Sequence, residues 1–256
     1  MKATITCIII SILLFGSVQE VRGQQSNALQ VEYVGNMGVA ITKGDTAILI
    51  DALHDYYKDA YLPSSPSFLD MLFAKRSPYK TVPAILVTHK HDDHFDSALV
   101  RKALDSHPEA KLLTGKQLDA FLYNRYKAQY RLTDDALFNA PAANIQINLK
   151  KIKHTYQQRH SGVHNYRAEI IWNNKKIIHI GDALDIEESL NGLNKVDVLI
   201  IPFWHFLDKG NVSQIEKLRP AMVILTHISP EGSPAAYLSD IIKPIEFKTY
   251  GQKVNF

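Results

Sequence analysis

The chain has 256 residues, of which 46% are hydrophobic and 21% are charged, the ordinary balance of a globular protein. Its 29 Lys and Arg against 26 Asp and Glu give a formal net charge of +3, and these charges are scattered along the sequence. Nucleic-acid-binding proteins usually carry more numerous and more clustered basic residues, so the composition argues against a nucleic-acid partner. The length suits one large domain, and no linker or shift in composition marks a second one.

The first residues have the layout of a secretory signal peptide. Lys2 supplies a positive charge, Ile5–Phe15 is mostly apolar, and Val21 and Gly23 are small residues suited to a cleavage site. The apolar run is shorter than the ~20 residues that a membrane-spanning helix needs. We therefore expect residues 1–23 to be a cleaved signal peptide and the protein to be periplasmic or secreted.

Removal of this segment leaves residues 24–256 as the single predicted domain, with no further apolar stretch long enough to span a membrane. It also removes Cys7, the only cysteine of the chain. The mature protein is therefore expected to have no disulfide, no thiol nucleophile and no thiolate ligand for a metal.

The first third of the mature chain is rich in short strands separated by tight turns. A long polar and aromatic loop over residues 52–66 follows the third strand; it contains His54, Tyr56, Tyr57 and Tyr61, and forms either a binding lid or a packed aromatic loop. The pattern predicts strands over Leu29–Gly35, Val39–Ile41, Thr46–Asp51 and Ala84–Val87, with a helix over Ser67–Lys75.

Beyond these strands, predicted helices and strands alternate. The predicted helices are Ser97–Leu104, Lys116–Tyr130, Gln214–Leu218 and one near Ala235–Ile242; the predicted strands are Lys111–Leu113, Asn144–Ile152, Tyr166–Trp172, Lys176–Ile180, Val196–Ile201 and Met222–Leu225. Two β-rich stretches, each followed by such alternation, indicate an α/β (α+β) fold with two packed sheets and helices outside them.

The most informative motif is His89-Lys90-His91-Asp92-Asp93-His94, which comes directly after the apolar strand AILVT. It places three imidazoles and a carboxylate within six residues, at the point where a buried strand ends. Imidazole nitrogen and carboxylate oxygen are ligands that suit zinc, and one tight loop can direct several of them toward a common centre. The motif therefore predicts a metal site.

This motif resembles the HxHxDH signature of the metallo-β-lactamase superfamily, a four-layer αββα fold of metal-dependent hydrolases built on two mixed β-sheets. Two later segments match further landmarks of that family. Gly181-Asp182 follows the strand KKIIHI and resembles its strand-end "GD" motif, and His227 follows AMVIL and resembles its final strand-end histidine. The resemblance extends from Leu29 to the C-terminus.

The family also has a histidine between the HxHxDH loop and the GD motif, and three histidines of this chain lie in that segment. His154 directly ends the strand INLKKIK, as the other expected ligands end theirs, and is the first choice. His164, at the start of the next strand, and then His160 remain the alternatives.

The resemblance implies two divalent metal ions, zinc first and manganese or iron as alternatives. One ion would be held by His89, His91 and His154, the other by Asp93, His94 and His227, with Asp182 bridging them. A hydroxide between the ions would attack the substrate, and the remaining charge of about +1 favours an anionic substrate. His179 is interpreted either as support for a ligand or as a core histidine.

The same comparison bears on the substrate. Ala183 follows the GD motif and the mature chain lacks cysteine, which argues against β-lactam hydrolysis. The segment Asp197–Phe203 resembles the ascorbate-6-phosphate lactonase-like (UlaG-like) branch, but the loop after Pro202 reads FWHFLDKG rather than a glycine-rich segment. His205 in this loop either contacts the substrate or the hydroxide, or packs in an aromatic cluster.

Together these features predict an exported dinuclear metal-dependent hydrolase that cleaves an ester, lactone, amide or phosphoester of a small molecule. Asp93, Asp182 and His205 are the residues expected to take part in catalysis. The alternatives are a mononuclear iron oxidoreductase on the same fold and a non-catalytic metal-binding scaffold.

Overall fold

The computed structural model describes residues 28–57, 59–122, 124–132, 135–140, 143–155, 162–232 and 237–256. The predicted signal peptide and His160 lie outside these ranges. No helix within them combines the length and the apolar character that crossing a membrane requires.

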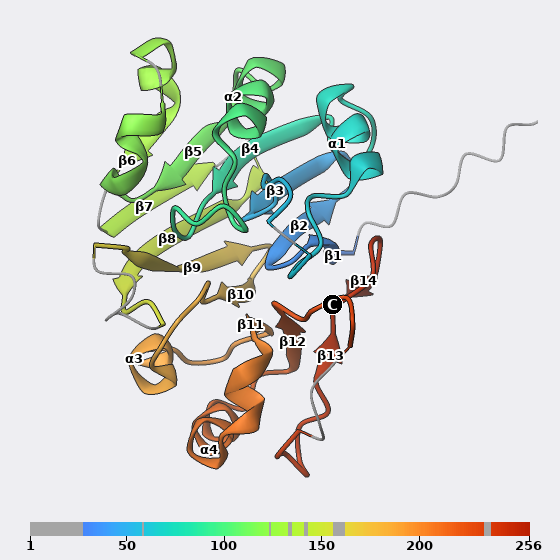
Figure 1. The fold of residues 1–256 in the computed structure, drawn as a ribbon, viewed down its shortest axis with the longest axis vertical. Helices are drawn as coiled ribbons and strands as arrows, with labels where there is room; N and C mark the ends of the chain where they lie inside the picture. Colours follow the sequence, from blue (N-terminus) through green and yellow to red (C-terminus); the bar gives the residue numbers. More distant parts are fainter. Residues whose placement is uncertain are drawn as a thin grey trace, which may run out of the picture.

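The described strands form two seven-stranded sheets, each antiparallel at one end and parallel at the other (Figure 1). In the first sheet the order is β14-β1-β2-β3-β4-β5-β6, and the pairing changes to parallel between β3 and β4. Its strands are β1 (Gln30–Gly35), β2 (Gly38–Lys43), β3 (Thr46–Ile50), β4 (Thr81–Leu86), β5 (Lys111–Thr114), β6 (Tyr130–Leu132) and β14 (Lys253–Asn255).

The second sheet has the order β13-β12-β11-β10-β9-β8-β7, with parallel pairing from β10 to β13. The β9–β10 hairpin turns at Asn173 and Asn174, both with positive φ (49° and 61°), as a two-residue hairpin turn requires. The strands are β7 (Asp135–Ala140), β8 (Ile145–Ile152), β9 (Asn165–Trp172), β10 (Lys175–His179), β11 (Val198–Pro202), β12 (Met222–Thr226) and β13 (Ile245–Glu246).

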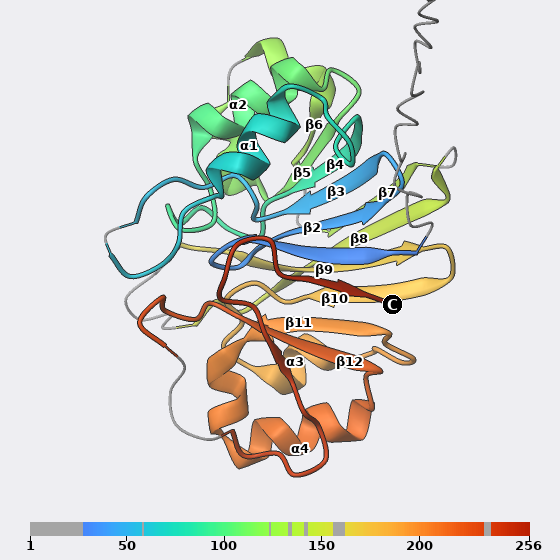
Figure 2. The ribbon, with the colours of Figure 1, turned by 90° about the vertical axis from the view of Figure 1, so that its right-hand side faces the viewer.

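Helices cover the outer face of each sheet, and Figure 2 shows the resulting four layers edge-on. The first sheet carries α1 (Pro66–Phe73) and α2 (Ser97–Ser106), and the second carries α3 (Ile186–Leu190) and α4 (Lys209–Leu218). Three of these helices begin at an aspartate that accepts a hydrogen bond from a backbone N–H of the first turn, at Asp96, Asp185 and Asp208. The predicted αββα sandwich is confirmed.

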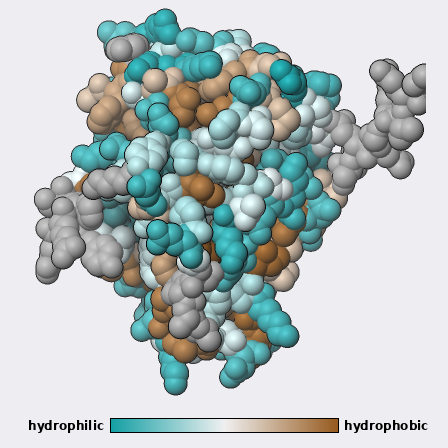
Figure 3. All heavy atoms as spheres, turned by 45° about the vertical axis from the view of Figure 1, so that its right-hand side comes forward, coloured by the Kyte–Doolittle hydropathy of each residue, from teal (hydrophilic) through white to brown (hydrophobic). Residues whose placement is uncertain are grey.

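Successive side chains of a strand point to opposite faces of its sheet, so neighbouring residues contribute to different hydrophobic clusters. Ile48 and Ile50 of β3 lie in the cluster between the two sheets, whereas Ala47 and Leu49 lie in the cluster beneath α1 and α2. A third cluster packs α3 and α4 against the second sheet. On the face shown in Figure 3, separate hydrophobic patches are interspersed with hydrophilic side chains.

Two predicted helices are wrong in their described parts. The segment Lys116–Tyr130 forms two short 3-10 helices, η1 (Lys116–Phe121) and η2 (Asn124–Gln129), because Leu122 is extended (φ −113°, ψ 137°) and Tyr130 pairs with β5. In 237–242 the Ser239 hydroxyl accepts from two following backbone N–H groups, which competes with helical pairing. Residues 235 and 236 lie outside the described part.

Candidate metal centre

The expected ligands follow four strands that end at the same side of the sandwich. His89 to His94 follow β4, His154 follows β8, Asp182 follows β10 and His227 follows β12. Because these four strand ends lie at the same side of the sandwich, side chains that are distant in sequence come together there. The structure thus brings residues from both sheets into one cluster.

Within this cluster, the possible ligand atoms form two groups, and the atoms of each group lie within 4.8 Å of one another. In the first group, His89 Nε2 and His91 Nδ1 are 3.1 Å apart, close to the ~3.4 Å edge of a tetrahedral zinc site with 2.0–2.1 Å bonds. The first group contains His89, His91, His154 and Asp182, and the second contains Asp93, His94 and His227.

The Asp182 carboxylate lies between the two groups. Its Oδ2 is 3.9 Å from Nε2 of both His89 and His154 on one side. On the other side, Oδ1 is 3.3 Å from His94 Nε2 and Oδ2 is 3.4 Å from His227 Nε2. One buried carboxylate therefore faces ligand atoms of both groups, which is the arrangement that a bridging ligand requires.

The structure places His154, and not His164, in the cluster. A β-bridge joins His154 to Ala183, and Thr155 N donates to the Asp182 carbonyl (2.8 Å), so the chain after β8 runs beside the GD motif. The His164 ring instead lies 3.2 Å from Lys151 Nζ and belongs to neither group. His160 lies outside the described residues.

Asp51 is a buried functional residue that the sequence interpretation missed. Its carboxylate accepts from Thr88 N (2.8 Å), from Thr88 Oγ1 (2.6 Å) and from His94 Nδ1 (2.9 Å). Since the Thr88 hydroxyl donates to Asp51, it accepts from His89 Nδ1, 3.1 Å away. Both imidazoles thus carry their proton on Nδ1 and present the Nε2 lone pair to the cluster.

Asp51 directly follows β3, and β3 pairs in parallel with β4, the strand that precedes the HxHxDH motif. Carboxyl ends of adjacent parallel strands meet at one edge of a sheet, so this pairing was the signal that could have identified Asp51. Asn36, at the turn between β1 and β2, was missed as well. Its Nδ2 donates to the Asp93 carbonyl (3.0 Å) and to Asp93 Oδ2 (3.2 Å), which fixes the orientation of that carboxylate.

The backbone at the GD motif is held tightly. Gly181 has φ +52°, and a Cβ there would lie 2.3 Å from Asn165 Oδ1 and 2.8 Å from Thr88 Oγ1. His179 accepts from Gly181 N (3.2 Å) and donates to the Met37 carbonyl (3.0 Å), so it is a buried histidine that supports the GD turn. Only glycine fits at position 181 without strain.

Charges in the cluster shift one another's pKa values. Burial opposes charge at Asp93, but the charges of His94 and His227 outweigh it and lower the pKa of this carboxyl to about 2. Burial likewise opposes charge at His227, but the Asp182 carboxylate raises its pKa to about 9. Burial and the charge of His94 both hold the pKa of His89 well below its usual value. Cations entering the second group would therefore displace protons from its histidines.

The expected contact of His205 with the substrate or the hydroxide is wrong, because the ring is fully buried. Its Nε2 donates to the Ala183 carbonyl (3.1 Å) and its Nδ1 accepts from Asn211 Nδ2 (3.1 Å), so both nitrogens are engaged away from the cluster. Burial lowers the pKa of His205 to about 4. The residue supports the backbone next to Asp182 instead.

A cavity of about 500 Å³ opens onto the cluster. Tyr57 and Tyr61 come from the long loop after β3, so this loop reaches the cavity, whereas the Tyr56 side chain is 61% exposed and His54 is buried. The cavity is lined by Tyr57, Tyr61, His91, Asp93, His154, Thr155, Asp182, Phe203, Trp204, Leu207 and His227.

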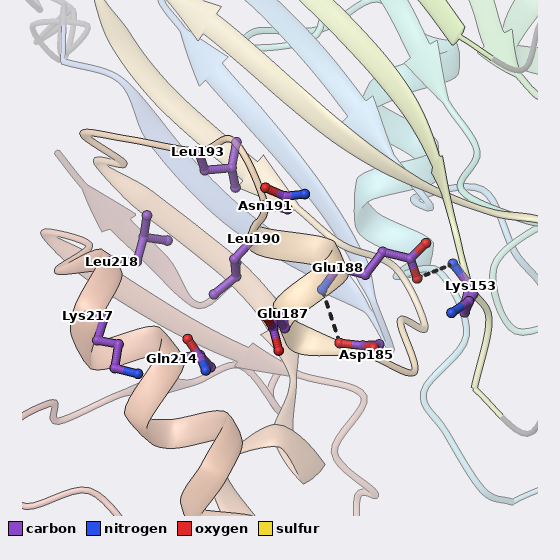
Figure 4. Close-up of a pocket in the computed structure, with 10 residues that line it drawn as sticks. All are labelled: Lys153, Asp185, Glu187, Glu188, Leu190, Asn191, Leu193, Gln214, Lys217 and Leu218. Atoms are coloured by element: carbon purple, nitrogen blue, oxygen red, sulfur yellow. Dashed lines mark hydrogen bonds between the residues drawn. The ribbon is translucent and has the colours of Figure 1, made fainter.

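A second cavity of about 620 Å³ lies between α3 and α4 (Figure 4). Two of its charged side chains serve the local fold: Asp185 Oδ1 accepts from Glu188 N (3.0 Å), and Glu188 Oε2 accepts from Lys153 N (3.3 Å). Neither group of candidate metal ligands in the described part of the chain lies there. The chemistry of the molecule is therefore expected at the smaller cavity.

Comparison with protein families gives a match over residues 30–227 to the β-lactamase superfamily domain. The chain belongs to this superfamily. Comparison with curated proteins gives no match. The matched range begins at β1 and ends at His227, so it includes every candidate ligand.

Solved structures of several other proteins share the fold. The metallo hydrolase Igni18 from Ignicoccus hospitalis superposes with a TM-score of 0.58 at 19% identity, over 90% of this chain and 98% of that chain. The metallo-β-lactamase fold protein YhfI from Bacillus subtilis gives 0.59 at 15% identity, over 90% and 100%. CmlA, a diiron β-hydroxylase from Streptomyces venezuelae, gives 0.56 at 14% identity, over 80% and 46%. At these identities, the likeness concerns the fold.

Proposed function

We propose that the protein is a dinuclear metal-dependent hydrolase that cleaves an ester, lactone, amide or phosphoester of a small molecule. The observation that carries this proposal is the position of Asp182, whose carboxylate lies 3.3–3.9 Å from histidine nitrogens of both candidate groups. A centre that binds one ion does not require a carboxylate placed between two groups of ligands.

The donor set fits two divalent ions. His94 Nε2 and Asp182 Oδ1 are buried and 3.3 Å apart, yet neither atom makes a hydrogen bond. Buried polar atoms are normally hydrogen-bonded, so such a pair indicates atoms arranged for a different partner. Nitrogen and oxygen ligands suit zinc, manganese or iron, and zinc is our first choice. Bound there, two ions would lower the pKa of a water molecule and stabilise negative charge on a substrate oxygen.

The chain's own residues prepare this centre. Asp51 and Thr88 fix the protons of His94 and His89 on Nδ1, so that both Nε2 atoms face the cluster. Asn36 holds Asp93 through two contacts of its amide group. Since these supports are all buried, the ligands are held in place by the fold before any ion binds.

Iron-dependent oxidation is the second candidate, because CmlA combines a similar fold with a diiron centre. The two classes differ in the metal retained and in the reaction that they support. A mononuclear iron oxidoreductase predicts one iron per chain, and a non-catalytic scaffold predicts metal binding without turnover.

We also propose that the protein is exported after cleavage of residues 1–23 and belongs to the UlaG-like branch. Export is supported by the apolar run and cleavage site of the N-terminal segment. The branch is supported by the segment from Asp197 to Phe203. Detection of a mature N-terminus at Gln24 in the periplasm or medium tests the export proposal.

Metal content and hydrolysis should be measured together on residues 24–256 purified without chelator. We expect about two equivalents of zinc or manganese and hydrolysis of at least one ester, lactone, amide or phosphoester. Asp182→Asn should lower both the second equivalent of metal and the activity. Asp197→Asn is the matched control, since this carboxylate binds Lys175 (2.7 Å) away from the cluster. Two equivalents retained in Asp182→Asn would refute the bridging role.

A further inference from the structure

The cavity over the metal-ligand cluster has two chemically different walls. One is made by the candidate ligands and Thr155, and the other by apolar and aromatic side chains, which we call the aromatic wall: Tyr57, Tyr61, Phe203, Trp204 and Leu207. Among the described residues that line the cavity, none is Lys or Arg. A substrate bound there therefore meets polar ligands at one end and a mainly aromatic surface without Lys or Arg at the other.

The aromatic wall lies directly against the second group of ligands. The rings of Tyr61 and Trp204 have their centroids 4.2 Å and 5.0 Å from that of His227, both in edge-to-face arrangement. Phe203 packs edge-to-face on Trp204, with centroids 5.8 Å apart. A substrate whose labile bond lies at the ligands would thus place its adjoining group against these rings.

The part of the wall after β11 is rigid. In the 3-10 helix η4 (Phe203–Leu207), His205 and Phe206 are fully buried. The two nitrogens of His205 are hydrogen-bonded, and the Phe206 carbonyl accepts from Leu238 N (3.0 Å). Anchoring these two residues leaves the other three, Phe203, Trp204 and Leu207, at the cavity.

The opposite part of the wall is fastened at the base of its loop. Ser64 Oγ accepts from His54 N (2.9 Å) and donates to the Ala52 carbonyl (2.8 Å). The two ring nitrogens of His54 lie 2.9 and 3.1 Å from the carbonyls of Asp51 and Leu62. The ends of the segment that carries Tyr57 and Tyr61 are therefore tied together, which lowers the entropy lost when these rings bind a ligand.

From this arrangement we propose that the substrate is an uncharged molecule with an aromatic or other apolar group beside its labile bond, in place of the anionic substrate expected from the charge of the centre, and that Trp204 and Leu207 select this group. The inference rests on the proposed hydrolase function. Transfer of an apolar group from water to such a wall is favourable, whereas a phosphate placed there would lose hydration without a Lys or Arg partner among the described lining residues. Negative charge then develops only at the metal ligands, during the reaction.

Turnover by the metal-loaded protein tests the inference with three lactones: γ-butyrolactone, its γ-phenyl derivative and a phosphorylated sugar lactone. We expect kcat/KM for the phenyl derivative to exceed that of each of the others by at least about tenfold. Leu207→Ala should reduce this preference, and Leu137→Ala, the same change at a 73% exposed site outside the cavity lining, should leave it unchanged.

Binding without turnover gives an independent readout. Of the two tryptophans, Trp172 is only 2% exposed in the core, so a fluorescence change on ligand binding reports on Trp204. Benzylacetone, a neutral aromatic ketone with no hydrolysable bond, should bind the metal-loaded protein at least about tenfold more tightly than butanone. Trp204→Phe should abolish the signal while keeping an aromatic ring in the wall.

The outcomes separate the two proposals. Aromatic preference in both turnover and binding supports both of them. Preference in binding without turnover of any lactone supports the aromatic wall as a binding site and counts against lactone hydrolysis. Turnover that is equal for the lactones, or fastest for the phosphorylated one, overturns the inference and leaves the hydrolase standing. Absence of both lactone turnover and binding preference overturns the inference and excludes lactones as the substrates of the hydrolase.

Discussion

Replacement of Asp51 by asparagine is expected to weaken metal binding at both candidate groups while keeping the fold. The amide retains an oxygen for Thr88 N, but it turns an N–H toward the atoms that Asp51 Oδ2 faces now, Thr88 Oγ1 and His94 Nδ1. His94 Nδ1 would then accept, and its proton would move to Nε2, the atom that faces the cluster. The Thr88 hydroxyl, no longer needed as a donor to Asp51, would donate to His89 in the same way.

The size of the effect follows from these contacts. Loss of a hydrogen-bond partner of a ligating histidine typically weakens metal affinity 10–100-fold, or about 1.4–2.7 kcal/mol. His94 contacts Asp51 directly at 2.9 Å, so the affinity for the ion held by His94 should decrease by ~100-fold, the upper end of this range. His89 is connected to Asp51 only through the Thr88 hydroxyl, so the affinity for the other ion should decrease by ~10-fold.

The assay is a zinc titration in competition with a chromophoric chelator, with circular dichroism as a check on folding. Asp197→Asn is again the control, because it makes the same chemical change where the carboxylate binds Lys175 Nζ and Lys176 N. Two zinc ions bound by Asp51→Asn with unchanged affinities would refute the argument that Asp51 sets the protonation of His89 and His94.

Three further predictions concern single residues. His154→Ala should weaken binding of the first ion by more than ~100-fold, whereas His164→Ala should leave the zinc titration unchanged; equal losses would contradict the assignment of His154. Gly181→Ala should lower the free energy of unfolding, measured in urea, by about 3 kcal/mol, because φ at this position is +52° and the added Cβ would collide with Asn165. An unchanged urea midpoint of unfolding would mean that the backbone of the turn adjusts without strain. Burial lowers the pKa of His205 to about 4, so its contribution to the free energy of unfolding is present above pH ~6.5 and is lost as the pH falls toward 4. In His205→Gln the free energy of unfolding should therefore fall by about 3 kcal/mol less over this pH range. Parallel plots of unfolding free energy against pH for the two proteins would contradict this prediction.

The sequence predicted the parts of the centre that a short motif carries. His89, His91, Asp93 and His94 lie within one loop, so their proximity needs no knowledge of the fold. Asp182 and His227 could be found because each follows an apolar strand segment at a position that resembles a landmark of the family. His154 stood out for the same reason among three histidines.

The sequence could not show what depends on contacts between distant segments. The role of Asp51 depends on β3 and β4 lying side by side, and that of Asn36 on a contact across 57 residues. The β14 strand has only three residues, too few for a pattern, and exists because it pairs with β1. His205 looked like a site residue because it follows a strand, but its ring turns inward to the Ala183 carbonyl.

The candidate ligands are divided between the two halves of the sandwich: the loop after β4 belongs to the first sheet, and the residues after β8, β10 and β12 belong to the second. Each ion held there would act as a cross-link between halves whose other contacts are their apolar faces and hydrogen bonds such as that from His179 to the Met37 carbonyl. An ion present at 100 times its dissociation constant adds about 2.7 kcal/mol to the stability of the assembled state. Metal supply would then govern how long the protein survives proteolysis as well as whether it is active, since parting of the sheets would require release of the ions.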